Sequence, residues 1–320
     1  MPGGRLRLLF MGTPEFTVPV LESLIQAENV EVVGVYTPPD RPKGRGRAVE
    51  MPPVKSFALD QGLPVFQPAS LRPETIQQEL AALDPDVIVV AAYGKLLPEA
   101  VLTTPAYGCL NLHPSLLPKY RGPSPVATTI LEGEPTTGVT LMLLDQGMDT
   151  GPIIAQRECS LLGGETAGSL TEALFRLGGE LLLENLGPWV AGEVSANSQD
   201  ESLASITSKL QRQDGEADWR LSAKELERRH RAFTPWPGLF TVWEGKVLKL
   251  LDVKTSSPGS DQHAEAAHQP GRVVATTGSG AEVATGEGML ELRTVQLEGR
   301  RAQSASEFMR GYPSVIGSLL

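Results

Sequence analysis

An asparagine and a histidine stand two residues apart at the end of a predicted strand. The strand is the apolar run Cys109–Leu112, which contains Asn111 and is followed by His113. Side chains alternate across a strand with a period of two, so Asn111 and His113 point to the same side. A carboxamide N–H can stabilise a developing oxyanion, and an imidazole can move a proton or share the negative charge. The pair therefore suits acyl transfer.

A carboxylate downstream completes a candidate catalytic set. Asp149 lies in DQGMDTGP, an acidic, glycine-rich stretch between two predicted strands, where it could orient His113 or hold a water. Asp145 begins the same stretch, and spacing alone does not separate the two, since either could be only a turn-former. His113 is the one histidine before residue 200. It is therefore the natural group for proton transfer near neutral pH in this half of the chain. We predict catalytic roles for Asn111, His113 and Asp149.

Other interpretations of these residues stay open. A single asparagine or histidine at a strand end is more often a structural cap than a catalytic group. Cys109 lies on the same strand face as Asn111, which leaves a thiol nucleophile open, although no second base is evident nearby. The first strand–helix turn, MGTPEF, lacks GxGxxG, and the chain contains no GxxxxGKS/T loop. Both absences argue against a dinucleotide or nucleoside triphosphate as ligand.

The elements around these residues predict an α/β fold. Over residues 5–190, short β-branched runs such as Val30–Tyr36 alternate with segments of helical apolar spacing such as Phe16–Gln26. The run DVIVVAA at 86–92 is apolar on both faces, as expected of a buried parallel strand. We predict a doubly wound, mostly parallel, Rossmann-type sheet, which binds ligands beyond the carboxyl ends of its strands.

The second half of the chain has a different character. Residues 192–207 are largely polar and lack periodicity, so we expect a linker there. A predicted helix at Ala223–Ala232 is followed by short strands with glycine-rich turns, which are typical of a small OB-like β-barrel. We predict a catalytic domain at 1–191, a linker at 192–207 and a C-terminal domain at 208–320.

Composition restricts the classes of function. The chain has 320 residues and a net charge of −10, which argues against non-specific nucleic-acid binding. A basic cluster is the exception: Arg41, Lys43, Arg45 and Arg47 alternate with proline and glycine. Two cysteines make neither a metal cluster nor a disulfide framework. No apolar run approaches the roughly 18 residues of a membrane span, and the first apolar run is too short for a signal peptide. We expect a cytoplasmic protein without a metal or a membrane partner.

Two motifs together resemble a known family. NLHPSLLPKYRG followed downstream by DTG resembles the signature of the 10-formyltetrahydrofolate-dependent formyltransferases. Asn111, His113 and Asp149 fall on the catalytic positions of that family. The SLLP stretch falls on its folate-associated loop, and VAAYGKLLP is similar to its strand beside the pterin pocket. The resemblance implies 10-formyltetrahydrofolate as formyl donor, no metal, and folate contacts by Ser115, Leu116, Leu117, Pro118, Tyr93, Lys95 and Leu97.

Further motifs are similar to the branch of the family that formylates methionyl initiator tRNA. They are MGTPEF, PDRPKGRGR, SKL before DW, and RAFTPWPG. The resemblance implies attack of the methionine α-amine on the formyl carbon, with Asn111 and His113 stabilising the oxygen of the tetrahedral intermediate. It implies that the barrel holds the tRNA backbone. The residues expected to bind tRNA are Arg41, Lys43, Arg45, Arg47 and Lys209. From composition alone, the basic loop could equally be a solvated surface loop.

Three other functions share features with this sequence. A sugar-nucleotide amine formyltransferase would keep the chemistry but would not need the arginine-rich loop. A 10-formyltetrahydrofolate hydrolase would use the same three residues with water as acceptor. A non-catalytic RNA-binding protein would have no need of Asn111, His113 and Asp149. We also expect a monomer.

Overall fold

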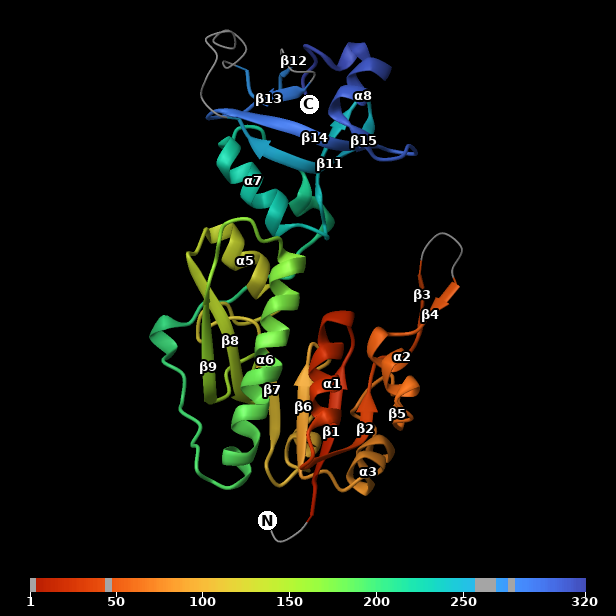
Figure 1. Cartoon of the computed structure of the whole chain (residues 1–320), viewed down its shortest axis with the longest axis vertical. Coiled ribbons are helices and arrows are strands. Elements are labelled where there is room, and N and C mark those ends of the chain that lie inside the picture. Colours follow the sequence, from red (N-terminus) through yellow and green to blue (C-terminus); the bar gives the residue numbers. More distant parts are fainter. Residues whose placement is uncertain (1–3, 44–47, 257–268, 276–279) are drawn as a thin grey trace. The chain divides into compact units, whose positions relative to one another are not determined.

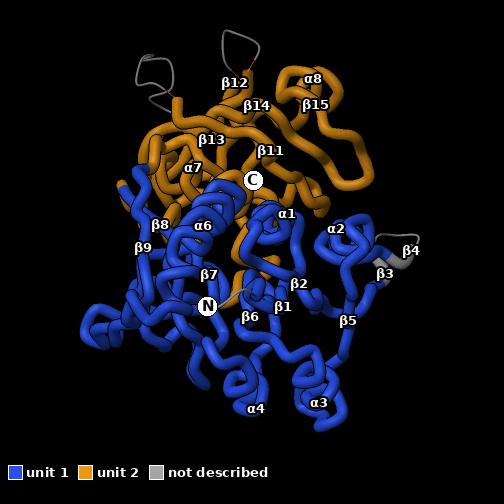
Figure 2. Tube along the Cα trace, turned by 60° about the horizontal axis from the view of Figure 1, so that its bottom comes forward, with its two compact units in different colours: residues 1–125, 136–160, 170–207 blue, residues 126–135, 161–169, 208–320 orange. Residues whose placement is uncertain are grey.

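The computed structural model describes residues 4–43, 48–256, 269–275 and 280–320. The chain divides into two compact units (Figure 2). Unit 1 comprises Met1–Pro125, Thr136–Ser160 and Leu170–Thr207. Unit 2 comprises Val126–Pro135, Leu161–Ser169 and Ser208–Leu320.

Unit 1 is built on a seven-stranded sheet with the strand order β5-β2-β1-β6-β7-β8-β9 (Figure 1). The strands are β1 Leu6–Gly12, β2 Val30–Tyr36, β5 Val65–Phe66, β6 Val87–Ala91, β7 Cys109–His113, β8 Thr136–Leu143 and β9 Ile153–Ser160. Pairing is parallel from β5 to β7, whereas β8 and β9 run antiparallel at one edge. The predicted doubly wound, mostly parallel α/β sheet is confirmed.

Helices cover both faces of this sheet because the strands are apolar on both sides. Leu8 and Phe10 of β1 pack with residues of α1, α2 and α6, while Leu9 and Met11 pack with residues of α3 and α4. The helices are α1 Val18–Gln26, α2 Pro53–Asp60, α3 Glu74–Ala82, α4 Glu99–Leu102 and α6 Ala167–Val190, with short 3-10 turns η1 Glu15–Thr17 and η2 Glu201–Leu203. Two helix layers around one sheet leave the strand ends as the place for a site.

Unit 2 contains a six-stranded antiparallel sheet in the order β10-β11-β14-β13-β12, with β15 beside β14. Its strands are β10 Leu239–Trp243, β11 Lys246–Thr255, β12 Val273–Ala275, β13 Ala281–Ala284, β14 Met289–Leu297 and β15 Gln303–Ser304. Its helical elements are α5 Pro125–Glu132, η3 Arg212–Gly215, α7 Ala223–Ala232, α8 Ala305–Gly311 and η6 Pro313–Val315. The predicted antiparallel β domain is confirmed, and its closure into an OB-like barrel stays a prediction. Among the described helices of the chain, each is too short or too polar to cross a membrane.

Candidate active site

The candidate site lies at the carboxyl end of β7, between its parallel neighbour β6 and its antiparallel neighbour β8. In β7, Asn111 pairs with Val90 of β6 and His113 pairs with Thr140 of β8. Both polar side chains are nearly buried, with exposed fractions of 9% for Asn111 and 4% for His113. Such burial of polar side chains needs partners or a ligand to offset the lost hydration. The two residues thus lie side by side at the strand end, as their spacing predicts.

The ring of His113 is fixed between a carbonyl and a carboxylate. Its Nε2 lies 2.9 Å from the carbonyl oxygen of Tyr120. A carbonyl can only accept, so Nε2 carries the proton in the neutral ring. Nδ1 faces Oδ2 of Asp149 at 3.6 Å, which is longer than a direct hydrogen bond. The neutral imidazole therefore presents Nδ1 as a proton acceptor, with a carboxylate beside it to stabilise the imidazolium.

The structure separates the two candidate carboxylates. Asp149 accepts a hydrogen bond at Oδ2 from the backbone N–H of Gly122 at 2.7 Å, which holds it opposite His113. Asp145 instead accepts from the backbone of Gly147 at 3.0 Å and from the hydroxyl of Thr150, so it stabilises its own loop. The geometry therefore favours Asp149.

Backbone strain accompanies this arrangement. Tyr120 and Asp149 both have left-handed backbone conformations, with φ of 61° and 56°. Such a conformation costs a non-glycine residue of the order of 1–3 kcal/mol and persists only where its surroundings hold it. The two strained residues are those that contact the two nitrogens of His113.

The carboxamide of Asn111 is uncommitted. Within the described part of the chain it makes no hydrogen bond, although the residue is nine-tenths buried. The carboxamide N–H of Asn111 is therefore free to donate to an acceptor oxygen of a ligand.

The SLLP loop is fastened to β8 and β9. Leu117 N–H donates to the hydroxyl of Thr140 at 3.1 Å, and that hydroxyl donates to the carbonyl of Ser115 at 2.6 Å. The carboxamide of Gln156 donates to the carbonyl of Leu117 at 2.8 Å. Leu116 packs over Gly138, where a Cβ would clash with its side chain. The loop leading to Pro118 is therefore rigidly placed after His113.

The other predicted folate residues lie on a separate strand end. Tyr93 is buried, and burial raises the pKa of its hydroxyl to about 12. This hydroxyl has no hydrogen-bond partner among the residues that the structure describes. Lys95 donates through Nζ to the carbonyls of Pro68 and Ala69 at 2.6 and 2.8 Å. Leu97 packs against the core cluster that contains Tyr93. Among the described residues, no hydrogen bond or ion pair joins these three side chains to Asn111, His113 or Asp149.

Cys109 does not have the properties of a nucleophile. It is 1% exposed and belongs to the core between the sheet and α3 and α4. Burial raises the pKa of its thiol to about 12, so the thiolate is absent near neutral pH. The residue is a core side chain.

The comparisons with known proteins decide the family. The family model described as "Formyl transferase" matches residues 5–186, and "Formyl transferase, C-terminal domain" matches residues 209–313. A methionyl-tRNA formyltransferase of Chloroflexus aurantiacus is 48% identical over 96% of this chain and 97% of its own length. That of Marinobacter nauticus is 42% identical over 97% of this chain and 98% of its own length. The chain belongs to the methionyl-tRNA formyltransferase family.

Solved structures share the fold of this formyltransferase. HypX from Aquifex aeolicus in complex with tetrahydrofolic acid aligns with a TM-score of 0.66 at 17% identity, covering 98% of this chain and 48% of HypX. This chain therefore spans about half the length of HypX. An N-formyltransferase from Helicobacter canadensis, in complex with folinic acid and dTDP-3-aminofucose, aligns with a TM-score of 0.63 at 17% identity, covering 90% of this chain and 98% of its own length.

The predicted tRNA-binding residues of the formyltransferase are only partly described. Arg41 is exposed in β3 (Arg41–Lys43), which pairs with β4 (Ala48–Glu50). Lys43 ends β3, whereas Arg45 and Arg47 lie outside the described residues. Lys209 is exposed in unit 2. At the base of the hairpin, Asp40 accepts from Lys55 at 2.7 Å, which lowers the pKa of that carboxyl.

Arg121 is a site residue that sequence reasoning missed. The residue is 4% exposed, and its guanidinium donates to both carboxylate oxygens of Glu201 at 2.8 and 2.9 Å. This hydrogen bonding lowers the pKa of the Glu201 carboxyl. An arginine in a polar loop ordinarily indicates a surface position, and only its place in the KYRG motif could have suggested otherwise.

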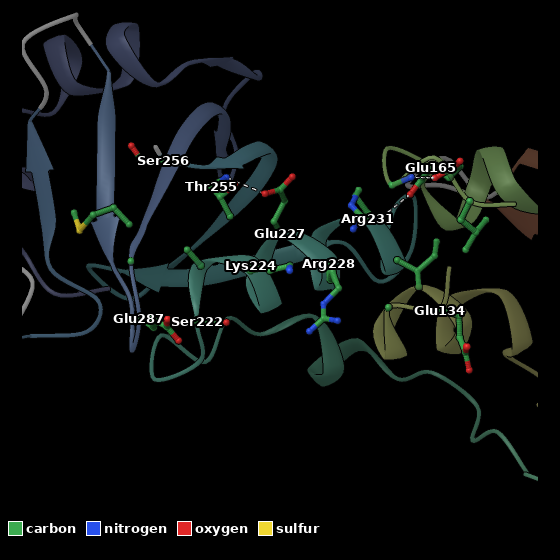
Figure 3. Close-up of a pocket in the computed structure, with 17 residues that line it drawn as sticks. Glu134, Glu165, Ser222, Lys224, Glu227, Arg228, Arg231, Thr255, Ser256 and Glu287 are labelled. Atoms are coloured by element: carbon green, nitrogen blue, oxygen red, sulfur yellow. Dashed lines mark hydrogen bonds between the residues drawn. The ribbon is translucent and has the colours of Figure 1, made fainter. Parts of the chain in front are cut away.

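Unit 2 of the formyltransferase contains a pocket of about 720 Å³ (Figure 3). Three cationic side chains and four carboxylates line it: Lys224, Arg228, Arg231, Glu134, Glu165, Glu227 and Glu287. Two of them are held by the backbone, since Arg231 donates to the carbonyl of Glu165 and Glu227 accepts from the N–H of Thr255. The mixed charge gives no net attraction for a polyanion. Among the described residues, no cluster of three metal-ligating side chains occurs.

Proposed function

We propose that this enzyme transfers the formyl group of 10-formyltetrahydrofolate to the α-amino group of methionyl initiator tRNA. The product is formylmethionyl-tRNA for translation initiation. The observation that carries the proposal is the similarity over nearly the whole chain to methionyl-tRNA formyltransferases at 42% and 48% identity. The Asn111–His113–Asp149 arrangement in unit 1 supports it independently.

The three residues can divide the chemistry among them. When bound, 10-formyltetrahydrofolate supplies an activated formyl carbon. Asn111 donates from its carboxamide to the formyl oxygen as negative charge develops there. Nδ1 of His113 accepts the proton that the attacking amine loses, and it returns this proton to the departing folate nitrogen. Asp149 stabilises the transient imidazolium at 3.6 Å.

The folate contacts are proposed from the loop and strand ends around His113. The SLLP loop, held by Thr140 and Gln156, would present a fixed surface to the donor. The folate residues that we propose are Ser115, Leu116, Leu117, Pro118, Tyr93, Lys95 and Leu97. Structures of HypX with tetrahydrofolic acid and of the Helicobacter enzyme with folinic acid share this fold.

The tRNA contacts and domain limits are proposals of the same kind. We propose a catalytic domain at 1–191, a linker at 192–207 and a tRNA-binding domain at 208–320. The proposed tRNA-binding residues are Arg41, Lys43, Arg45, Arg47 and Lys209. We also propose that the protein is a monomer and that it acts in the cytoplasm. Light scattering tests the oligomeric state, and cell fractionation tests the location.

An acceptor assay tests the proposed function. Release of tetrahydrofolate from 10-formyltetrahydrofolate is followed with methionyl initiator tRNA, with a sugar-nucleotide amine, or with neither. We expect turnover with the tRNA, one formyl group on each methionine amine, and little release without it. Faster turnover with the sugar amine, or equal release with water alone, would replace the proposal with one of those two activities. Absence of turnover in all arms would leave a non-catalytic RNA-binding protein.

A further inference from the structure

Part of the predicted linker runs along the loops of the candidate site. The segment in question, residues 197–207, belongs to unit 1. It begins where Asn197 exchanges two backbone hydrogen bonds of 2.8 Å with Ile153 of β9. It ends where Thr207 N–H donates to the carbonyl of Arg121 at 2.7 Å. Between these points Ser205 N–H donates to the carbonyl of Pro118 at 3.2 Å.

Hydrophobic burial does not explain why this segment lies there. Its large apolar side chains are exposed, with 62% of Leu203 and 73% of Ile206 accessible to water. Polar contacts therefore carry the attachment. Burying little apolar surface makes a segment weakly held, unless directional hydrogen bonds fix it.

One carboxamide in the segment connects both loops that contact His113. Oε1 of Gln199 accepts from Nε and Nη2 of Arg121 at 3.0 and 2.9 Å. Nε2 of Gln199 donates to the carbonyls of Asp149 and Gly151 at 2.8 and 2.7 Å. Both donor positions and both acceptor positions of this side chain are thus occupied.

The two anchored loops hold the two nitrogens of the imidazole. Arg121 follows Tyr120, whose carbonyl fixes Nε2 of His113, and Asp149 faces Nδ1. The hydroxyl of Ser205 accepts from Tyr120 N–H at 2.9 Å, which adds a second attachment on that side. On the other side, Gln199 holds the backbone of Asp149, a residue with φ of 56°.

We propose that Gln199 is a positioning residue for formyl transfer, setting the separation between the Tyr120 carbonyl and the Asp149 carboxylate on either side of His113. The inference rests on the proposed function. Gln199 touches neither reacting group, and it acts through Arg121 and Asp149. The competing interpretation is that it only attaches the 197–207 segment to unit 1.

Gln199→Glu separates these interpretations because it alters one half of the contact. The new carboxylate still accepts from Arg121, so the segment stays attached. It can no longer donate to the carbonyls of Asp149 and Gly151, and it repels them. Asn197→Asp is the matched control, since it makes the same amide-to-acid change at an exposed position of the segment. Gln199→Met, which removes all polar atoms at similar length, replaces Gln199→Glu if the latter fails to fold, since the backbone hydrogen bonds of Asn197, Ser205 and Thr207 still attach the segment.

The first readout is the steady-state rate of methionyl-tRNA formylation. We expect Gln199→Glu to lower kcat by about 10- to 100-fold, because a misplacement of about 1 Å can cost on the order of 10²-fold. KM for tRNA and for the folate should change less than about threefold, and the melting temperature should stay close to that of the wild type. Asn197→Asp should leave all of these values at wild-type level.

The second readout is the imidazole ¹⁵N spectrum of His113 in the absence of substrates. The wild type should show the Nε2–H tautomer, and Gln199→Glu should shift the His113 resonances, whereas Asn197→Asp should not. If the wild type formylates tRNA, both the loss of kcat and the spectral shift are required, and absence of either overturns the proposal. Because the spectrum needs no acceptor, it still tests the positioning role if the wild type failed to formylate tRNA.

Discussion

The protonated nitrogen of His113 is set by one contact, the 2.9 Å distance from its Nε2 to the carbonyl oxygen of Tyr120. Since the carbonyl can only accept, the proton resides on Nε2 and the lone pair of Nδ1 faces Asp149. A strand residue, His113, is thus combined with two strained loop residues. The orientation of the imidazole, and with it the direction of the Nδ1 lone pair, depends on these loops as much as on β7.

We predict that the two carboxylates of the DQGMDTG turn contribute unequally. Asp149→Asn keeps an acceptor for Gly122 N–H but removes the charge beside Nδ1, so kcat should fall on the order of 10²-fold or more. Asp145→Asn is the control. It affects only contacts to Gly147 and Thr150, so its kcat should fall far less. The steady-state formylation rates of both variants measure the two losses of kcat. The reverse ranking would show that Asp145 is the functional acid.

The buried thiol of Cys109 should be chemically silent. Its pKa is raised to about 12 by burial, against about 8.5 for an unfolded thiol. The protonated thiol therefore adds stability that is fully present below about pH 8.5 and is lost progressively as the pH rises to about 12. Urea unfolding at pH 8 and pH 10 should show a larger loss for the wild type than for Cys109→Ala.

Formylation by Cys109→Ala should stay within about threefold of the wild type, since the folded protein holds no thiolate there near neutral pH. If Cys109→Ala stayed folded but its formylation rate fell by two orders of magnitude, the thiol would have a role in the mechanism.

The basic loop predicts a salt-dependent tRNA contact. Arg45 lies outside the described residues, so this prediction rests on the sequence, where glycines flank it on both sides. Arg45→Ala should raise KM for methionyl-tRNA strongly and leave folate affinity unchanged. If Arg45 contacts a phosphate, the slope of log K against log salt should fall by close to one unit. Arg72→Ala removes an exposed arginine elsewhere in unit 1 as a control. Normal tRNA use by Arg45→Ala would refute the contact.

Regular elements could be predicted where local patterns and caps agree. The helix Ala223–Ala232 and the strand Val30–Tyr36 have the predicted bounds. The helix begins at a capping box between Ser222 and Glu225, a local signal. The helix predicted from Phe16 begins at Val18 instead, after a 3-10 turn. The helix Pro125–Glu132 escaped prediction because its first residue, Pro125, resembles the prolines of the loop before it.

The site could be predicted only in part. The period of two along β7 places Asn111 and His113 together, and this needs no tertiary information. The preference for Asp149 over Asp145 depends on a loop that brings Gly122 to its carboxylate from 27 residues away. The contact of Gln199 with Asp149 spans 50 residues between two segments without periodicity, so no local pattern contains it.

The direct test of the account is the single-turnover rate of formyl transfer by Asn111→Ala, with saturating 10-formyltetrahydrofolate and methionyl initiator tRNA. The uncommitted carboxamide of Asn111 is the proposed oxyanion donor, and removal of one such donor typically costs about 10²–10³ in rate. We predict a loss of this size, with folate affinity and melting temperature near those of the wild type. A single-turnover rate close to that of the wild type would contradict the proposed mechanism.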